Sequence, residues 1–359
     1  MAFATLNNVK ISAMAAAVPS NRESNYDLPF DPEVNRKLVT TTGIENRHVA
    51  PEGMCASDLC FAAAERLLTD NNIDRSSIGL LIFNSQTPDY KIPYTSGHLQ
   101  HRLGLSTDTM CFDMTMGCSG YVYALFVAGS MLETGQIRRA LVLAGDVLTP
   151  EVSKFDRSAR PLFGDAGSAT LLEFEEGNIS KWGLNTDGSG YNSLIVEAGG
   201  GRKSTSEESL IYKEYGTDIR RRDTDVNISG MDIFNFSISL VPKVINAFTD
   251  HFAIKKDEID LWLLHQANLI INNILAKKLE IPAGKMPLSL HEFGNTSSVS
   301  IPLTAVTKGK FEIEKGASRV FMSGFGTGLS CASCVLDLAG VRFSDLVFCR
   351  LKAFRTQRS

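Results

Sequence analysis

The 359-residue sequence predicts an α/β protein whose helices pack on sheets, because short apolar segments alternate with amphipathic ones. A short segment that recurs in the second part of the chain further indicates two related halves. The length and the hydrophobic content of 43% are sufficient for a sizeable core. That core is expected either in one large domain or in two closely packed halves.

Short runs of apolar residues are typical of buried strands, and longer runs with one apolar face are typical of helices. The predicted strands are 78–84, 140–144, 169–174, 261–264 and 319–323. The predicted helices are 56–70, 121–133, 233–248 and 269–279. Their order along the chain predicts sheets covered by helices.

The recurring segment begins with a Thr-Asp pair and continues to an isoleucine. Residues 69–73 lead to a strand that includes residue 80, and residues 249–254 lead to a strand at 261. In both copies an amphipathic helix precedes the segment, and the strand after it ends in a glutamine, Gln86 or Gln266. Matches this short also arise by chance, so they indicate a duplication without establishing it.

Charge and hydropathy argue against several classes of protein. The formal net charge is −4 and the pI is near 5.9, so nucleic acid is not expected as a partner, although a local basic patch could dock an acidic protein. Residues 1–19 contain a single charged side chain, Lys10, and lack the pattern of a signal peptide. No run approaches the roughly 20 apolar residues of a membrane span. A soluble, cytoplasmic protein is therefore expected.

The seven cysteines are an odd number in a long chain, and most lie in apolar runs, so a disulfide framework is not expected. Cys331 and Cys334 form a Cys-x-x-Cys pair without a second pair or a nearby histidine. We therefore predict cysteines within a strand, and no metal site.

Cys118 lies between small residues in the sequence Met-Gly-Cys-Ser-Gly, at 116–120. It follows an apolar segment and directly precedes the helix predicted from residue 121. A sharp turn at this point presents the sulfur at a helix N-terminus, where backbone N–H groups and the helix dipole favour the thiolate. A nucleophile is the sharper interpretation, and a buried structural cysteine is the alternative.

Two further polar residues lie at the ends of predicted elements. His265 follows the strand 261–264, at the edge where open α/β sheets build sites, although a lone histidine there also serves as a helix cap. Asn295 lies in a Gly-Asn-Thr-Ser-Ser loop, where asparagine is commonly a turn residue. The glycine-rich turn at 324–328 lacks the spacing of phosphate-binding loops and suits a close backbone approach to a substrate oxygen.

Four motifs, in this order, resemble the 3-oxoacyl-[acyl-carrier-protein] synthase III family. They are Gly-Cys-Ser-Gly at 117–120, His-Gln-Ala-Asn at 265–268, Gly-Asn-Thr-Ser-Ser at 294–298 and Gly-Phe-Gly-Thr-Gly at 324–328. Similar stretches at 42–48, 87–104 and 163–169 extend the resemblance over about residues 5–338. It implies a thiolase-like fold with a layered α-β-α-β-α arrangement. The halves would be 1–175 and 176–338, followed by a basic extension at 339–359.

The resemblance also implies a chemistry. Cys118 would be acylated by a thioester, with the oxyanion held by the backbone N–H groups of Cys118 and Thr327. His265 and Asn295 would hydrogen-bond a malonyl thioester and stabilise the enolate that forms as carbon dioxide leaves. An asparagine in place of a second histidine is similar to the synthase III and chalcone synthase branches. The family acts with acyl carrier protein in acyl-chain biosynthesis, forms homodimers and needs no metal, flavin or nicotinamide.

Substrate-binding positions also follow from the resemblance: Arg157, Phe234, Ile92 and Asn268. The loop 89–93, with Ile92, would line the acyl pocket of a neighbouring subunit. Relatives that use acyl-coenzyme A carry a tryptophan and two arginines where this chain has Lys37, Thr41 and Ile270. The loss of a stacking partner and of cations predicts a carrier-protein thioester or an unusual acyl group as the donor.

Carrier proteins are acidic, so a basic surface near the site entrance is expected to dock them. Lys277 and Lys278 are the first candidates, and the arginines at 220–222 are the second. Both sets also fit an ordinary solvated face. The polar stretch 199–225 reads as a surface excursion that could guard the site or dock a carrier.

The extension carries basic residues, and its apolar residues recur at helical spacing between 343 and 354. We therefore expect an amphipathic helix that packs on the body or on a dimer, with contact to a membrane surface as the alternative.

Two other functions are compatible with the motifs. One is transfer of the acyl group from Cys118 to an alcohol or amine without decarboxylation. The other is a non-catalytic subunit that only shapes a dimer, which the presence of Cys118, His265 and Asn295 argues against.

Overall fold

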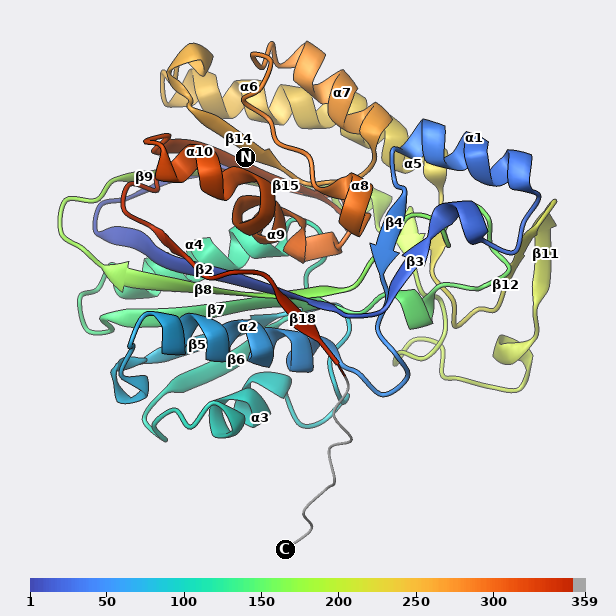
Figure 1. Cartoon of the computed structure of the whole chain (residues 1–359), viewed down its shortest axis with the longest axis horizontal. Coiled ribbons are helices and arrows are strands. Elements are labelled where there is room, and N and C mark those ends of the chain that lie inside the picture. Colours follow the sequence, from blue (N-terminus) through green and yellow to red (C-terminus); the bar gives the residue numbers. More distant parts are fainter. Residues whose placement is uncertain (351–359) are drawn as a thin grey trace, which may run out of the picture.

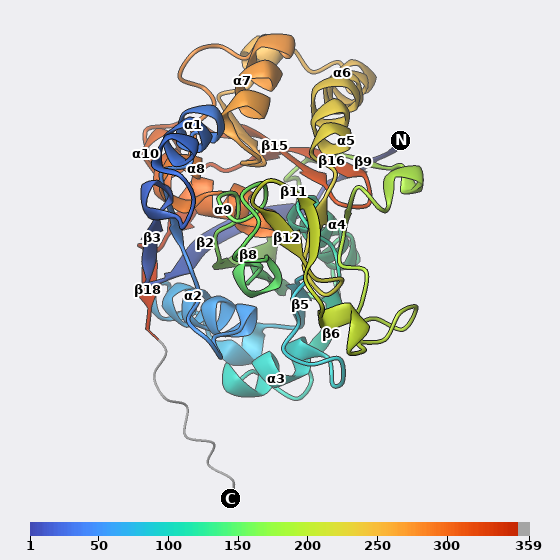
Figure 2. The same cartoon turned by 90° about the vertical axis from the view of Figure 1, so that its right-hand side faces the viewer.

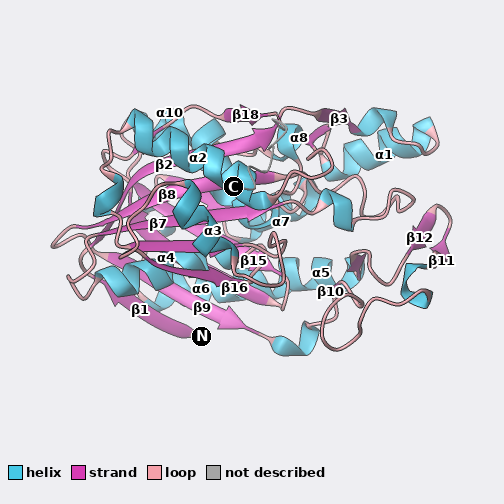
Figure 3. Ribbon diagram, turned by 90° about the horizontal axis from the view of Figure 1, so that it is seen from below, coloured by secondary structure: helices cyan, strands magenta, loops and turns pink. Residues whose placement is uncertain are grey.

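The computed structural model describes residues 1–350 and has five layers, in which two sheets alternate with three layers of helices (Figure 1). This confirms the predicted α/β class and the layered arrangement. Figure 3 shows the strands of both sheets running along the molecule, with long loops and a small hairpin gathered at one end.

One sheet has the strand order β17-β2-β8-β7-β5-β6, and β18 also pairs with β2. Its strands are β2 (Val9–Pro19), β5 (Leu80–Asn84), β6 (Met110–Met114), β7 (Arg139–Asp146), β8 (Ala166–Phe174), β17 (Arg342–Phe343) and β18 (Val347–Cys349). The second sheet has the order β1-β9-β16-β15-β14. Its strands are β1 (Ala2–Leu6), β9 (Ser180–Thr186), β14 (Leu261–Leu264), β15 (Arg319–Gly326) and β16 (Ser330–Asp337).

The two sheets share a topology. The run β2-β8-β7-β5 in the first corresponds to β9-β16-β15-β14 in the second, each with two antiparallel pairs followed by one parallel pair. The internal repeat seen in the sequence therefore corresponds to a repeat in the fold. The division of the chain at residue 175 remains a prediction, and β1 and β17 pair with strands from the other part of the chain.

The recurring segment adopts the same local structure twice. Asn72 and Ala253 both have a φ of +50°, a left-handed conformation that residues other than glycine seldom adopt. In each copy the following isoleucine donates its backbone N–H to the carbonyl five residues earlier: Ile73 to Leu68 at 3.0 Å and Ile254 to Thr249 at 2.8 Å. These bonds end the preceding helices in the same way and turn the chain into β5 and β14.

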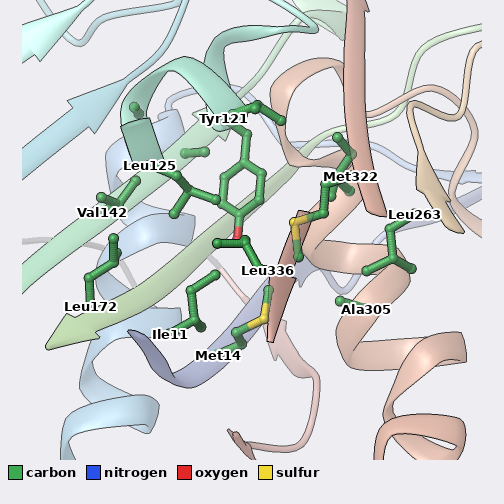
Figure 4. Packing of buried hydrophobic residues seen from close by; sticks show 14 of the residues in the cluster. Ile11, Met14, Tyr121, Leu125, Val142, Leu172, Leu263, Ala305, Met322 and Leu336 are labelled. Carbon is green, nitrogen blue, oxygen red and sulfur yellow. The ribbon is translucent and has the colours of Figure 1, made fainter. Parts of the chain in front are cut away.

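The middle layer lies between the sheets and consists mainly of α4 (Gly120–Leu132) and α9 (Ser300–Thr304), with α10 (Lys310–Glu314) nearby. Strand side chains alternate between faces, so each sheet sends one set inward. Tyr121 and Leu125 of α4 pack there with Val142, Met322 and residues of both sheets (Figure 4). The largest cluster of buried apolar residues therefore holds the two sheets together.

The outer layers cover the other faces of the sheets. On the first sheet lie α2 (Ala56–Asp70) and α3 (Thr95–Arg102), and on the second lie α6 (Val241–His251) and α7 (Leu269–Lys278). Trp262 and Phe321 face α6 and α7, whereas their strand neighbours Leu261 and Met322 face the middle layer. This alternation explains why these strands read as continuous apolar runs in the sequence.

The remaining elements lie mostly at the loop-rich end of the molecule (Figures 2 and 3). They are α1 (Pro32–Thr42), β3 (Arg22–Ser24), β4 (Asn46–His48), β10 (Leu194–Ile195), β11 (Lys213–Gly216), β12 (Ile219–Arg221), β13 (Asn227–Ile228), α5 (Gly230–Asn235) and α8 (Leu290–Phe293). The predicted surface excursion 199–225 contains the hairpin β11–β12, which projects from the body in Figure 1.

The predicted helix in the C-terminal extension is wrong for the described residues, which form β17 and β18 instead. Both strands pair in parallel with β2, which would otherwise be the edge of its sheet. Backbone bonds such as Ser20 N–H to the Cys349 carbonyl, at 2.7 Å, satisfy groups that an edge strand leaves open. The predicted packing on the body is confirmed as far as residue 350. The apolar positions 351 and 354 lie outside the described residues.

The two cysteines of the Cys-x-x-Cys pair lie in one strand. All seven cysteines are free, and Cys331 and Cys334 lie in β16 as predicted, with their side chains in clusters on opposite faces of the sheet. Within residues 1–350, none of the helices combines the length and the apolar character that crossing a membrane requires.

Candidate active site

Cys118 lies at the turn between β6 and α4, directly before the residue that caps the helix. The side chain is 7% exposed. Glycines allow this close packing: a Cβ on Gly326 would lie 2.9 Å from the Cys118 sulfur, and one on Gly324 would lie 2.6 Å from the Cys118 carbonyl oxygen. The Gly-Phe-Gly-Thr-Gly segment, whose first three residues end β15, therefore approaches the cysteine through its backbone. The predicted approach to a substrate oxygen stays a prediction.

Burial raises the pKa of the Cys118 thiol to about 11, and a hydrogen bond with the Ser297 side chain partly opposes this effect. The negative charge of Asp146 raises the pKa further, and backbone N–H groups of Thr327 and Cys118 lower it. This differs from the expectation that a helix N-terminus favours the thiolate. Desolvation outweighs the helix dipole here because the sulfur is almost entirely removed from water.

The raised pKa predicts how Cys118 reacts with iodoacetamide as the pH changes. Only the thiolate reacts, and its fraction rises with pH as long as the pH stays well below about 11. The alkylation rate should therefore rise about tenfold per pH unit from pH 6 to 9, where that of a free cysteine begins to level off near pH 8.5. Peptide mass spectrometry follows the Cys118 peptide separately. A rate that is constant over this range would indicate a preformed thiolate.

His265 follows β14 and is fully buried beside the ring of Phe325, whose centroid lies 5.3 Å away in an edge-to-face arrangement. Its Nδ1 atom lies 2.7 Å from the Ser300 hydroxyl. Burial lowers the pKa of His265 to about 3, and a hydrogen bond with the backbone of Ser297 acts in the opposite direction. The imidazole is therefore neutral at physiological pH and has one N–H to donate.

Asn295 lies near the start of the loop between α8 and α9 and is buried. Its Oδ1 atom accepts the backbone N–H of Ser297 at 2.9 Å, which leaves the Nδ2 hydrogens for another acceptor. Ser297 has a φ of +51°, and this left-handed conformation is unusual for a serine. The bond from Asn295 helps to hold it.

Ser297 joins the three predicted catalytic side chains. Its hydroxyl lies 3.9 Å from the Cys118 sulfur, its N–H binds Asn295, and its backbone bonds His265. A thiol, a neutral imidazole and a carboxamide, from three distant segments of the chain, thus surround one serine. Because Cys118 and Thr327 direct backbone N–H groups at the sulfur, an oxyanion formed at an attached acyl group would have donors close by.

Asp146, at the end of β7, anchors this arrangement and was not singled out in the sequence. It is fully buried and accepts the N–H of Gln86 at 2.8 Å, together with the N–H and hydroxyl of Ser298 at 3.2 and 2.7 Å. Burial raises the pKa of Asp146 to about 6, whereas these hydrogen bonds lower it. One carboxylate therefore ties the loop after β5 to the loop that carries Asn295 and Ser297.

Sequence reasoning also missed the roles of Gln86, Ser297 and Ser300. The glutamine was noticed only as part of the repeat, and the serines only as members of a polar loop. A signal was present, since polar residues directly after strands and in small-residue loops are the ones that approach a site. Which of them turn toward the sulfur depends on the packing of the two sheets.

The other predicted substrate residues lie in varied surroundings. Arg157 donates its Nε hydrogen to the Thr217 carbonyl at 2.8 Å, beside the β11–β12 hairpin. Asn268 caps α7 by accepting the Ile271 N–H at 2.9 Å. Phe234 packs at the edge of the outer cluster formed with α6 and α7, and Ile92 is 88% exposed. Their contacts with substrate remain predictions.

The two candidate docking surfaces also differ. Lys277 and Lys278 are exposed at the end of α7, where Lys278 donates to the Ile238 carbonyl at 2.8 Å. Arg221 forms an ion pair with the buried Asp156, and Arg222 pairs with Asp225 at 2.7 Å. Arg220 lies 3.9 Å from Glu214 and stacks 4.3 Å over the Phe155 ring, so each arginine of the run 220–222 already has a partner within the chain.

Comparison with known proteins places the chain in a family. Residues 112–188 match the model of 3-oxoacyl-[acyl-carrier-protein (ACP)] synthase III, and residues 250–338 match the model of its C-terminal region. The β-ketoacyl-[acyl-carrier-protein] synthase III of Lactococcus lactis subsp. lactis (strain IL1403) is 33% identical over 335 residues, which cover 92% of this chain and 99% of the relative. That of Streptococcus pyogenes serotype M2 (strain MGAS10270) is 33% identical over 334 residues, with the same coverage of both chains.

Solved structures support the same family assignment. The crystal structure of 3-oxoacyl-(acyl-carrier protein) synthase from Burkholderia xenovorans LB400 superposes with a TM-score of 0.89 at 34% identity, covering 97% of this chain and 99% of that one. The fold and the enclosed thiol define a thiolase-fold condensing enzyme of the acyltransferase class. Within that class, the chain belongs to the 3-oxoacyl-[acyl-carrier-protein] synthase III family. The predicted family, fold and enzyme class are confirmed.

Proposed function

We propose that the protein catalyses a decarboxylative Claisen condensation in fatty acid or related acyl-chain biosynthesis. Cys118 accepts an acyl group, and His265 and Asn295 assist its transfer to malonyl-acyl carrier protein. The observation that carries the proposal is the convergence of thiol, imidazole and carboxamide on Ser297. The names of the relatives, which include acyl carrier protein, support the choice of carrier.

In the first step the Cys118 sulfur bonds to the acyl carbon of a thioester while the carbon–sulfur bond of the donor breaks. The thiol proton passes to the departing thiolate, so the step is balanced. The backbone N–H groups of Cys118 and Thr327 stabilise the oxyanion of the tetrahedral intermediate. Proton loss must accompany the attack, because the buried thiol rests protonated.

In the second step the malonyl carboxylate leaves as carbon dioxide and its electrons form an enolate. The neutral His265 and the Nδ2 group of Asn295 donate hydrogen bonds to the enolate oxygen. The enolate carbon then bonds to the acyl carbon, and the carbon–sulfur bond to Cys118 breaks. The thiolate takes up one proton, which restores the thiol and leaves β-ketoacyl-carrier protein.

The proposed donor is a carrier-protein thioester rather than acyl-coenzyme A. Lys37 and Thr41 are exposed on α1, and Ile270 is exposed on α7. None of these side chains stacks on a base as tryptophan does, and Thr41 and Ile270 lack the charge with which arginine binds phosphate. Lys277 and Lys278, on the same helix as Ile270, are the proposed contact for an acidic carrier.

We also propose a homodimer. The edge strand β6 has Met110 exposed, and the loop before α3 exposes Tyr90, Ile92 and Tyr94. An open strand edge beside an apolar loop is typical of a surface that is covered in the assembled protein. Light scattering should give twice the chain mass of 39.2 kDa. A mass of one chain would contradict the dimer.

The test supplies malonyl-acyl carrier protein with either acetyl-coenzyme A or acetyl-acyl carrier protein. We expect carbon dioxide and β-ketoacyl-carrier protein, with faster acylation of Cys118 from the carrier thioester, as measured by intact-protein mass spectrometry. Ester or amide products without carbon dioxide would contradict the condensation. Efficient acylation by acetyl-coenzyme A alone would contradict the proposed donor.

A further inference from the structure

Gln86 follows β5 and its side chain lies beside the reactive thiol. Its Oε1 atom is 3.5 Å from the Ser297 hydroxyl, and the same hydroxyl is 3.9 Å from the Cys118 sulfur. The carboxamide occupies the space next to Gly117, the residue before Cys118. A Cβ on Gly117 would collide with Oε1 and would lie 3.0 Å from the Thr327 hydroxyl. Two polar side chains therefore meet at a position that only a glycine leaves open.

The side chains of Gln86 and Thr327 each have a hydrogen-bond donor without an acceptor in the part of the chain that the structure describes. The Ser297 hydroxyl donates to Gln86 Oε1, so the carboxamide oxygen is occupied and Nε2 remains. Among residues 1–350 the Gln86 Nε2 group has no protein acceptor, and the buried Thr327 hydroxyl has no partner. A buried donor without an acceptor is unfavourable unless a ligand supplies one. The ligand group that fits two donors is an oxygen.

Gln86 is also held in place. Its backbone N–H binds Asp146 at 2.8 Å, and Asp146 fixes Ser298, next to Ser297. Asp146 thus connects the loop that carries Gln86 to the loop that carries Ser297. A polar group fixed in this way before the substrate arrives discriminates more strongly than one that must first be ordered.

We propose that Gln86 is a specificity-determining residue for the acyl group. With Thr327 it forms a polar subsite beside Cys118 that favours short acyl groups carrying a hydroxyl or carbonyl oxygen on the second or third carbon. Plain alkyl groups of the same length leave both donors unpaired. This inference rests on the proposed function, because it concerns the acyl group that Cys118 accepts.

The test compares acylation of Cys118 by 3-hydroxybutyryl, acetoacetyl, lactyl and butyryl thioesters of one thiol, N-acetylcysteamine, measured by intact-protein mass spectrometry. The wild type should react at least about tenfold faster with the best oxygen-bearing acyl group than with butyryl, the discrimination expected of one well-placed hydrogen bond. Gln86→Glu keeps the length of the side chain but replaces the Nε2 donor with an acceptor, and Gln86→Leu removes both polar atoms. In both variants the rate ratio should fall at least about threefold, to the preference that the Thr327 hydroxyl alone provides.

The outcomes separate this inference from the function on which it rests. If no thioester labels Cys118 in the wild type, the proposed function fails. If the wild type is labelled but shows no preference for oxygen-bearing groups, the inference is overturned without any variant being needed. A preference that persists undiminished in Gln86→Glu and Gln86→Leu overturns the assignment to Gln86. If the variants lose rate equally with all four thioesters, at an unchanged ratio, the assignment to Gln86 is also overturned, because Gln86 would then contact the part of the donor that all four share.

Discussion

Cys118→Ala is expected to abolish acyl-enzyme formation and to lower condensation by at least about 10⁴-fold, the order of loss seen when a covalent nucleophile is removed. No neighbouring side chain replaces the thiol as a nucleophile. The Ser297 hydroxyl, 3.9 Å away, would need a base to remove its proton, and His265, whose pKa is about 3, is too weak a base for this. The measurement is the mass increase of the protein with an acyl thioester, followed by product formation with malonyl-acyl carrier protein.

Cys111→Ala provides the matched control. Cys111 lies on β6, near Cys118 in sequence and only partly buried, and the substitution removes the same sulfur without touching the site. It should retain acylation and condensation. Decarboxylation of malonyl-acyl carrier protein should survive in Cys118→Ala, since His265 and Asn295 remain. Full condensation activity in Cys118→Ala would contradict the nucleophile. A wild type that never becomes acylated would favour the non-catalytic subunit.

Asn295→Asp is expected to leave acylation of Cys118 within a few-fold of the wild type but to lower condensation by at least about 10³-fold. The aspartate has the same shape, and one oxygen can still accept the Ser297 N–H that Asn295 binds at 2.9 Å. The other oxygen replaces the Nδ2 donor and places a negative charge where the enolate charge develops. The second step therefore loses a hydrogen bond and gains a repulsion, whereas the first step needs neither group.

The measurements are the rate of acyl labelling and the rate of carbon dioxide release, each on the same preparation. Asn192→Asp adds the same charge at an exposed position and should affect neither rate. Equal losses of labelling and of carbon dioxide release in Asn295→Asp would mean that Asn295 acts on the structure of the loop rather than on the enolate. Thermal unfolding of both variants identifies such a loss.

Much of the fold could be predicted from local patterns. The apolar runs that became β5, β7, β14 and β15 are buried on both faces, and such runs keep their strand character wherever they pack. The repeat was visible because the segments before β5 and β14 share a Thr-Asp pair and an isoleucine, which make the same turn around a left-handed residue, Asn72 or Ala253. Cys118, His265 and Asn295 could be predicted as site residues because their motifs, in this order along the chain, resemble those of the synthase III family.

The C-terminal extension shows where local patterns fail. Its apolar residues fit a helical period, yet Val347 and Cys349 turn inward while Phe348, between them, is 59% exposed, as in a strand. The open edge of β2 decides this outcome, because its unpaired backbone groups come from residues more than 300 positions away. A window of sequence contains no information about that edge.

By itself, the sequence determined the α/β class and the duplicated order of elements, since these follow from side-chain periodicity and short motifs. It also predicted the thiol, imidazole and carboxamide as site groups, through motifs that resemble those of the family. Only the tertiary structure decided that Ser297 joins the three groups, that the Gln86 and Thr327 side chains meet beside Gly117, and that the thiol rests protonated. The physical reason is that hydrogen-bond partners and desolvation depend on every segment that packs around an atom, and around Cys118 those segments come from both halves of the chain.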